Sequence, residues 1–215
     1  MKSTIRKIDR ALKQLYNIEH SFSAEKFLIR NPLMPTAGQG ALFIQGKSSE
    51  SLSVGIFLDS DVTQTLAKFP KGEVAAWSLE QLGAFAVASE EVSHFNYFLH
   101  HHSQGRAVSQ LELEVQGEID KFLLTFFTNY VNEEVADLTR KFEALIDQFF
   151  QHYRLEENLT KEQKQRYKDA TKLAQRFLTK YRNHFSDPTK AETVLKLLRR
   201  FYRGSLAEKL ALSNP

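Results

Sequence analysis

Residues 78–124, SLEQLGAFAVASEEVSHFNYFLHHHSQGRAVSQLELEVQGEIDKFLL, contain two amphipathic runs joined by a short polar turn. Apolar residues recur at steps of three and four in each run, which places them on one side of an α-helix. Ser78 with Gln81, and Ser109 with Glu112, have the spacing of a capping box at the start of each helix. We therefore predict a helical hairpin that forms the packing centre of the chain. Its apolar stripes are Phe85, Ala88, Val92, Phe95 and Leu99 in the first helix and Leu111, Val115, Ile119, Phe122 and Phe126 in the second.

Acidic residues and one histidine lie beside these stripes. At 100° per residue, His94 points about 140° and Glu91 about 80° away from the centre of the first stripe, and Glu118 about 60° away from the second. His94 is thus not expected in the core. Counting residues outward from the turn puts His94 level with Glu118, and Glu91 level with Lys121. We predict one polar groove that contains Glu91, His94, Glu114, Glu118 and Lys121.

Two kinds of chemistry suit such a groove. Glu91 and His94 have the Glu-x-x-His spacing of ligands in carboxylate-bridged di-iron bundles, but the sequence has no second pair of this kind. One divalent metal ion held by Glu91, His94 and Glu118 is one hypothesis, and acid–base catalysis by His94 with a carboxylate is another. In either case Lys121 or Arg106 would hold an anionic substrate. The structural alternative is a set of ordinary polar pairs between and along the helices.

The run His100–His102 does not strengthen the metal hypothesis. Consecutive residues of a helix point about 100° apart, so three in a row cannot hold one ion from a regular helix. We expect these histidines at a fraying helix end, where the helix dipole favours positive charge.

The residues before the hairpin predict a helix and a small β-structure. Residues 31–40, NPLMPTAGQG, are rich in Pro and Gly and predict a loop. ALFIQ at 41–45 and the alternating pattern of 52–58 predict a β-hairpin with one buried face, and a short helix capped by Ser60 follows. The segments GQG and GKSS lack the spacing of a phosphate-binding loop. The apolar positions behind these predictions are Ile5, Ile8, Leu12 and Leu15 in the first helix and Leu52, Val54, Ile56 and Leu58 in the strand.

The remainder predicts long helices, because neither Gly nor Pro occurs between Gly117 and Pro188. We predict an α+β fold, predominantly α: an N-terminal helix and a small β-hairpin or sheet, followed by a bundle of four to five long helices. Residues 1–158 would form the core domain, and 159–215 a basic helical segment packed on the same domain. A third apolar stripe consists of Leu138, Phe142, Leu145, Phe149 and Tyr153, and Thr160 with Gln163 forms a capping box.

Charge is distributed unevenly along the chain. Residues 160–215 hold 14 Lys and Arg against 5 Asp and Glu, whereas residues 1–159 hold 15 against 21. Cations spaced along a rigid helix suit the phosphates of a nucleic acid. The alternatives are a solvated face or a surface that meets the acidic part of the same chain. The predicted polyanion-binding residues are Lys161, Lys164, Lys168, Lys172, Arg176, Lys180, Arg199, Arg200 and Arg203.

Composition narrows the class of protein. The 215 residues are 42% hydrophobic and 26% charged, which is typical of a globular protein. The absence of Cys excludes disulfides, thiolate metal sites and cysteine nucleophiles. We see neither a secretory signal nor a membrane span, and expect a soluble cytoplasmic protein. The leading hypothesis is a non-enzymatic binding or regulatory protein whose basic helices dock a polyanion, such as nucleic acid or an acidic protein; the alternative is a metal-dependent or acid–base enzyme.

Overall fold

The computed structural model of the protein describes residues 1–30, 38–46, 52–69, 77–130, 135–151 and 159–214. Its fold is α+β and predominantly α, as the sequence predicts. The α-helices are α1 (Lys2–Tyr16), α2 (Ser60–Ala67), α3 (Leu79–Ser103), α4 (Gln110–Tyr130), α5 (Val135–Phe150), α6 (Lys161–Lys180), α7 (Arg182–Phe185), α8 (Ala191–Arg203) and α9 (Leu206–Ser213). The strands are β1 (Leu28–Ile29), β2 (Gly40–Gln45) and β3 (Ser53–Leu58), and the 3-10 helices are η1 (Ala24–Lys26) and η2 (Pro188–Lys190).

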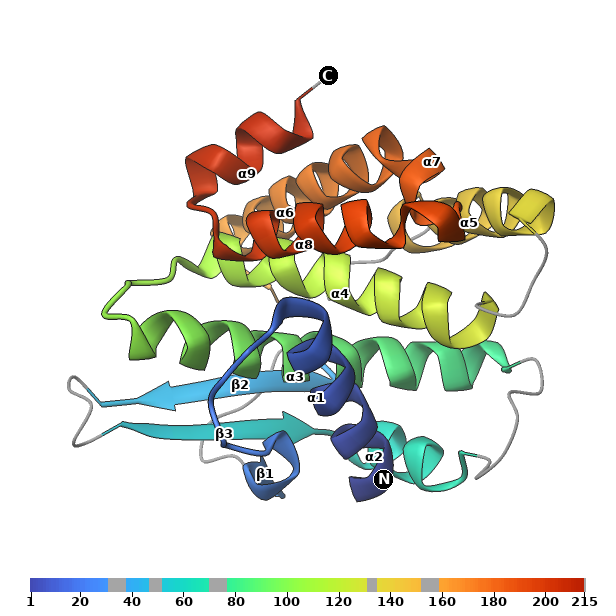
Figure 1. The fold of residues 1–215 in the computed structure, drawn as a ribbon. Helices are drawn as coiled ribbons and strands as arrows, with labels where there is room; N and C mark the ends of the chain where they lie inside the picture. Colours follow the sequence, from blue (N-terminus) through green and yellow to red (C-terminus); the bar gives the residue numbers. More distant parts are fainter. Residues whose placement is uncertain (31–37, 47–51, 70–76, 131–134, 152–158, 215) are drawn as a thin grey trace.

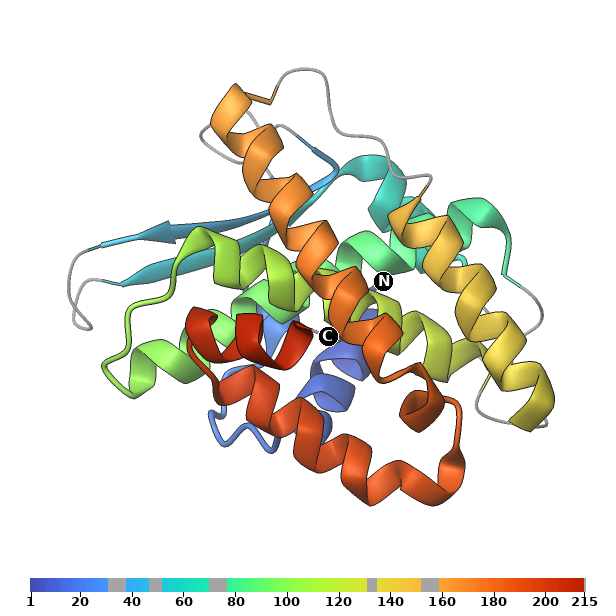
Figure 2. The ribbon, with the colours of Figure 1, turned by 90° about the horizontal axis from the view of Figure 1, so that it is seen from above.

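The helices α3 and α4 lie in the middle of the molecule, between the sheet on one side and α5 and α6 on the other (Figure 1). α1 and α2 also pack against α3, and α8 packs against α1. Figure 2 shows α6 crossing over α4, between α5 and α9. The predicted bundle of long helices consists of α3, α4, α5, α6 and α8. Within the described ranges, no helix combines the length and the apolar character needed to cross a membrane.

The predicted helical hairpin is confirmed. A reciprocal capping box joins Ser78 and Gln81 at the start of α3, and Ser109 and Glu112 exchange equivalent bonds before α4. Except for Leu111, which is partly buried, the predicted apolar stripes are buried. Burial on α3 extends well beyond its stripe, because α1, α2, α4, β2 and β3 all pack against this helix. Polar positions such as Ser93 and Asn96 are therefore buried too.

The sheet has the strand order β1-β3-β2, with β1 parallel and β2 antiparallel to β3. The predicted hairpin of β2 and β3 is confirmed, and it pairs Leu42 with Ile56. The Ile56 side chain is fully buried against the helices, which explains the alternation in the sequence. The N-cap of α2 is Asp59 rather than the predicted Ser60, because the Asp59 carboxylate accepts a hydrogen bond of 2.8 Å from the Val62 amide. Most of the predicted loop 31–40 lies outside the described residues.

The histidine run does not fray. α3 continues through Ser103, and both His100 and His101 are buried. The Nε2 atom of His101 lies 3.0 Å from the Tyr202 carbonyl oxygen of α8, and its ring packs on Tyr97. The prediction of a frayed end is wrong because a helix distant in the sequence covers this end of α3.

Hydrogen bonds connect α8, near the C-terminus, to the end of α1 near the N-terminus. Arg199 of α8 donates to the carbonyl oxygens of Gln14 and Leu15, and Arg203 donates to that of Tyr16. These carbonyls belong to the last turn of α1, whose own helix leaves them without amide partners. The predicted domain boundary at residue 158, like Tyr153 of the third stripe, lies outside the described residues.

A second feature of the core is a closed polar network, which we define as Tyr16, Ser93, Gln116, Asp120 and Lys209. The buried Asp120 carboxylate accepts hydrogen bonds from Tyr16, from Ser93 at 2.5 Å and from Gln116 at 3.0 Å. Lys209 of α9 donates 2.9 Å to the Gln116 side chain and 2.7 Å to the Phe201 carbonyl, and its ammonium lies 4.1 Å from the Phe201 ring centroid. The network thereby joins α1, α3, α4, α8 and α9.

Candidate functional site

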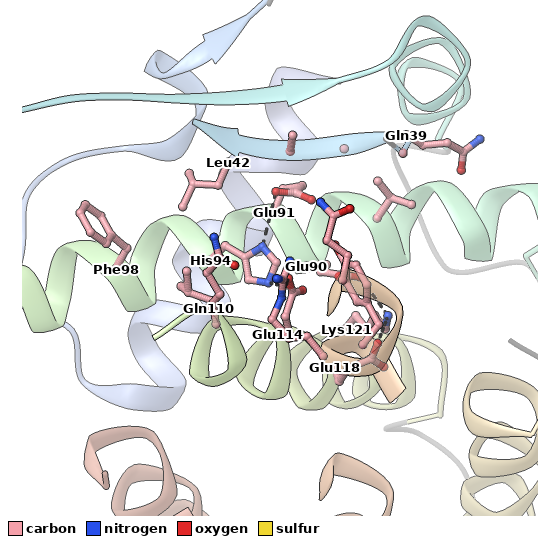
Figure 3. Close-up of a pocket in the computed structure, with 18 of the residues that line it drawn as sticks. Gln39, Leu42, Glu90, Glu91, His94, Phe98, Gln110, Glu114, Glu118 and Lys121 are labelled. Carbon is pink, nitrogen blue, oxygen red and sulfur yellow. Dashed lines mark hydrogen bonds and ion pairs between the residues drawn. The ribbon is translucent and has the colours of Figure 1, made fainter. Parts of the chain in front are cut away.

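A cavity of about 700 Å³ opens between β2, α3, α4 and the first half of α6. Its volume is in the range of small-molecule sites. Figure 3 shows Glu90, Glu91, His94, Glu114, Glu118 and Lys121 on facing turns of α3 and α4, below β2, and Arg166 of α6 also lines the cavity. We call these residues the cavity cluster, which consists of Glu90, Glu91, His94, Glu114, Glu118, Lys121 and Arg166.

Two glycines let the cluster assemble. A Cβ atom at Gly117 of α4 would lie 2.6 Å from His94 Nε2 and 3.0 Å from Glu90 Cγ. A Cβ atom at Gly40 of β2 would lie 2.7 Å from Glu91 Cγ. Real side chains do not approach this closely, so the missing side chains let His94 pack against the α4 backbone and Glu91 against β2.

His94 lies between two carboxylates. Its Nδ1 is 3.5 Å from Glu91 Oε2, and its Nε2 is 3.8 Å from Glu114 Oε2. Burial by itself lowers the pKa of His94, but Glu91, followed by Glu114 and Glu90, outweighs burial and raises the pKa to about 9. The imidazole is therefore protonated at neutral pH when only these groups surround it.

Glu114 of α4 connects the cluster to α6. Burial raises the pKa of the Glu114 carboxyl to about 7, although His94 and Arg166 act in the opposite direction. Arg166 donates from Nε to Glu114 Oε1 at 3.3 Å. A carboxyl with this pKa exchanges its proton near neutral pH, as a general acid or base requires.

Lys121 forms the other end of the cluster. Its ammonium donates 2.9 Å to both Glu90 Oε2 and Glu118 Oε1. Burial opposes the charge, but Glu118 and Glu90 raise the pKa of Lys121 above its usual value. Burial raises the pKa of Glu118, whereas the neighbouring Lys121 and His94 keep the pKa of Glu90 below its usual value despite burial. Lys121 thus forms ion pairs with two carboxylates of the cluster.

Among the described residues, three buried polar atoms of the cluster have ion-pair contacts of 3.5 and 3.8 Å but no hydrogen bond: Glu91 Oε2, His94 Nε2 and Glu114 Oε2. Each belongs to a residue less than 10% exposed. Buried polar atoms normally have partners, and leaving one without a partner costs about 1–3 kcal/mol. Their convergence on one cavity indicates a site for a ligand.

The charge of the cluster favours a cation. Four carboxylates face Lys121 and Arg166, which would leave two negative charges with every carboxylate ionised and His94 neutral, as it must be to bind a metal. That is the charge of one divalent ion. One donor atom from each of Glu90, His94 and Glu114 lies within 4.8 Å of the others. The 3.8 Å between His94 Nε2 and Glu114 Oε2 is close to the roughly 3.4 Å between two ligands of a tetrahedral ion bound at about 2.1 Å.

The structure brings Glu91, His94, Glu118 and Lys121 to one cavity, but their pairing differs from the prediction. His94 faces Glu114 rather than Glu118, because the two helices are displaced along each other relative to the level count. The expectation that His94 lies outside the core is wrong: His94 is 8% exposed, because β2 and α4 pack against the side of α3 from which it projects. Arg106 does not line the cavity; it pairs with Glu112 and donates to the Gly204 carbonyl.

Three members of the cluster were not among the predicted ligands or catalytic residues: Glu90, Arg166 and Glu114, of which Glu114 was predicted only to lie in the groove. Glu90 stands four residues before His94, and this spacing was available in the sequence. Arg166 had no local signal, because its approach to Glu114 depends on how α6 crosses α4.

The predicted polyanion-binding residues differ in their surroundings. Lys161, Lys168, Lys172 and Arg176 are exposed along one side of α6. Arg199 and Arg203 bind the end of α1. The others are placed as follows: Lys180 donates to the Asn214 carbonyl, Lys164 is partly buried, and Arg200 is exposed.

Comparison with protein-family models, curated proteins and solved structures found no match for this chain.

Proposed function

We propose that the protein is a metal-dependent enzyme whose cavity binds one divalent transition-metal ion through His94, Glu114 and Glu90. The observation that carries the proposal is the convergence of one possible ligand atom each from Glu90, His94 and Glu114, all within 4.8 Å of one another, in a cavity large enough to admit a substrate. Imidazole nitrogen and carboxylate oxygen suit ions such as zinc, iron and manganese.

Each residue has a role in this proposal. His94 would bind the ion through Nε2, and Glu91 Oε2, 3.5 Å from Nδ1, would orient the ring as carboxylates do behind many metal-bound histidines. Lys121 keeps Glu90 and Glu118 in place. Three protein ligands leave coordination positions open toward the cavity, where the ion would activate a water molecule or polarise a substrate oxygen.

Metal content tests the proposal. The purified untagged protein is stripped with a chelator, incubated with zinc, manganese or iron(II), desalted and analysed for metal. We expect about one ion per chain, and a loss of affinity of more than 100-fold in His94→Ala, because Nε2 is the only nitrogen ligand of the site.

The matched control is His102→Ala, which removes a partly buried imidazole of the histidine run that does not itself line the cavity. This variant should retain its metal. Substoichiometric metal in the wild type, or equal retention by His94→Ala, would refute the proposal.

A second candidate function is polyanion binding by α6, which we propose on a separate observation. Lys161, Lys168, Lys172 and Arg176 are exposed on one side of this helix, and among the described residues no carboxylate forms an ion pair with them. Such a row would neutralise phosphates of a nucleic acid or carboxylates of an acidic protein. We propose that this binding would take place in the cytoplasm, the location expected from the sequence.

Binding of a random oligonucleotide at low salt tests it. Changing Lys168, Lys172 and Arg176 together to Ala should lower the affinity and reduce the slope of log affinity against log salt by about 3. The control is Arg199→Ala with Arg203→Ala, whose guanidinium groups bind α1. Equal losses in the two variants, or no binding even at low salt, would count against a role for α6.

A further inference from the structure

The cavity has an apolar end that the metal proposal does not use. We define this apolar compartment as Leu42 of β2, Phe98 of α3, Val108 of the α3–α4 turn and Leu113 of α4. Figure 3 shows Leu42 and Phe98 on the side of His94 away from Glu118 and Lys121. Phe98 follows His94 by one helical turn, so the compartment begins about 6 Å from the imidazole along the helix axis.

The four side chains pack on the core yet remain partly exposed. They come from β2, α3, α4 and the turn between the two helices, and they line the same cavity as the carboxylates. Covering apolar surface that is exposed to water is favourable by about 25 cal/mol per Å². An apolar group that entered here would therefore contribute binding energy without contacting the ionic residues.

The head group of such a ligand is indicated by Arg166. This side chain uses Nε for Glu114, and its two terminal nitrogens have no hydrogen-bond partner among the described residues. Arg166 is 21% exposed at the side chain and lines the cavity beside the proposed metal ion. The planar guanidinium matches the geometry of carboxylate oxygens.

We infer that the substrate is an acyl compound, a carboxylic acid or carboxylic acid derivative, with an apolar acyl group. Its carboxyl or carbonyl oxygens meet Arg166 and the metal ion, and its acyl group lies against Leu42, Phe98 and Leu113. This inference rests on the proposed function, because it requires the ion as the second anchor of the head group.

Hydroxamates of increasing acyl length are suitable probes, because the head group is constant and binds metal through two oxygens. The zinc content of the protein is measured first. Acetohydroxamate, butanohydroxamate, hexanohydroxamate and benzohydroxamate are then titrated into the zinc-loaded protein by calorimetry. Each added methylene that is buried should raise the affinity by up to about fourfold, until the compartment is filled.

Two variants separate the head group from the acyl group. Phe98→Ala should reduce the gain from acetohydroxamate to benzohydroxamate at least fivefold, while zinc content and acetohydroxamate affinity stay as in the wild type. Arg166→Gln should weaken the four probes by a similar factor. Phe127→Ala is the control, because this partly exposed ring lies outside the cavity and should change neither quantity.

The outcomes distinguish the two ideas. If the wild type binds no stoichiometric zinc, manganese or iron, the proposed function fails and this inference fails with it. If metal binds but all four hydroxamates have the same affinity, or if Phe98→Ala leaves the length dependence intact, the metal site stands and the apolar acyl substrate is refuted.

Discussion

The α3–α4 hairpin carries two groups of buried polar side chains that differ in how well they are satisfied. In the closed polar network, Tyr16, Ser93, Gln116, Asp120 and Lys209 all make hydrogen bonds to protein atoms. In the cavity cluster, Glu91, His94 and Glu114 each have a buried polar atom that makes no hydrogen bond to any described residue. The cluster lines a cavity of about 700 Å³, whereas no member of the network does.

Burial of ionisable residues therefore does not identify a functional site by itself. The network contains a buried aspartate and a buried lysine, yet its members satisfy one another and join five helices. In the cluster, by contrast, three buried polar atoms make no hydrogen bond to any described residue, and the side chains line a cavity. We interpret the network as stabilising the fold and the cluster as serving a ligand. The predictions below test this division, from the largest expected effect to the smallest.

Asp120→Ala should have the largest effect on stability. The substitution leaves the Tyr16 hydroxyl, the Ser93 hydroxyl and the Gln116 amide without their buried acceptor. Breaking a buried charged network by removing one member typically costs about 3–5 kcal/mol. Urea denaturation should show a loss of this order in the free energy of unfolding.

The comparison is Glu91→Gln in the cavity cluster. Its Oε2 atom makes no hydrogen bond, so the free energy of unfolding should change by about 1 kcal/mol or less. Metal affinity should instead fall about 10- to 100-fold, because the orientation of His94 is disturbed. Equal destabilisation by both substitutions would erase the distinction between the two groups.

Lys209 should make the network sensitive to pH. Burial lowers the pKa of this lysine to about 7, against a usual value of 10.5, although Asp120 and Glu112 act in the opposite direction. Between these values the unfolded chain holds the proton and the folded chain does not. The contribution of Lys209 to stability is therefore greatest above pH 10.5 and is lost as pH falls through about 7.

Lys209→Met isolates this effect. As pH rises from 7 to 10, the free energy of unfolding of the wild type should increase by a few kcal/mol relative to that of the variant. Taking the difference removes contributions from groups common to both proteins, such as His94. A difference that is constant over this range would show that Lys209 titrates at its usual pKa.

Gly117→Ala should weaken metal binding with little loss of stability. The added methyl group would meet His94 Nε2 at 2.6 Å, so the imidazole must move away from α4. We expect metal affinity to fall about 10-fold or more, as is typical when the support of a ligand is disturbed.

Gly83→Ala is the matched control on α3, because a Cβ atom there meets nothing within 4 Å. Higher helix propensity should stabilise this variant by about 0.5–1 kcal/mol and leave metal affinity as in the wild type. If Gly117→Ala also keeps its metal affinity, His94 Nε2 is not a ligand.

Arg199→Ala should have the smallest effect, a loss of about 1 kcal/mol in the free energy of unfolding. Its guanidinium binds the carbonyl oxygens of Gln14 and Leu15 at the end of α1. Arg200→Ala, at an exposed position of the same helix, should lie within about 0.5 kcal/mol of the wild type. Thermal or urea unfolding of both variants measures this difference.

Much of the fold was predictable because it depends on local patterns. The structure contains the capping pairs at Ser78 and Thr160 and the alternating strand at 53–58. Each of these patterns involves residues only a few positions apart in the sequence. Spacing also identified Glu91, His94, Glu118 and Lys121 as one group. Their partners were less predictable, since a shift of one turn between α3 and α4 replaces Glu118 by Glu114 opposite His94.

The sequence by itself determined the helices, their caps, their apolar stripes and the clustering of acidic residues around His94, because these follow from periodicities of two and 3.6 residues. The tertiary structure alone decided that His94 is buried, that Arg166 reaches Glu114 and that Lys209 binds a carbonyl oxygen of α8. It also decided which of two similar polar groups is satisfied and which adjoins a cavity. Burial and hydrogen-bond satisfaction depend on residues of helices that lie from about 90 to more than 180 residues apart, and no local pattern encodes such contacts.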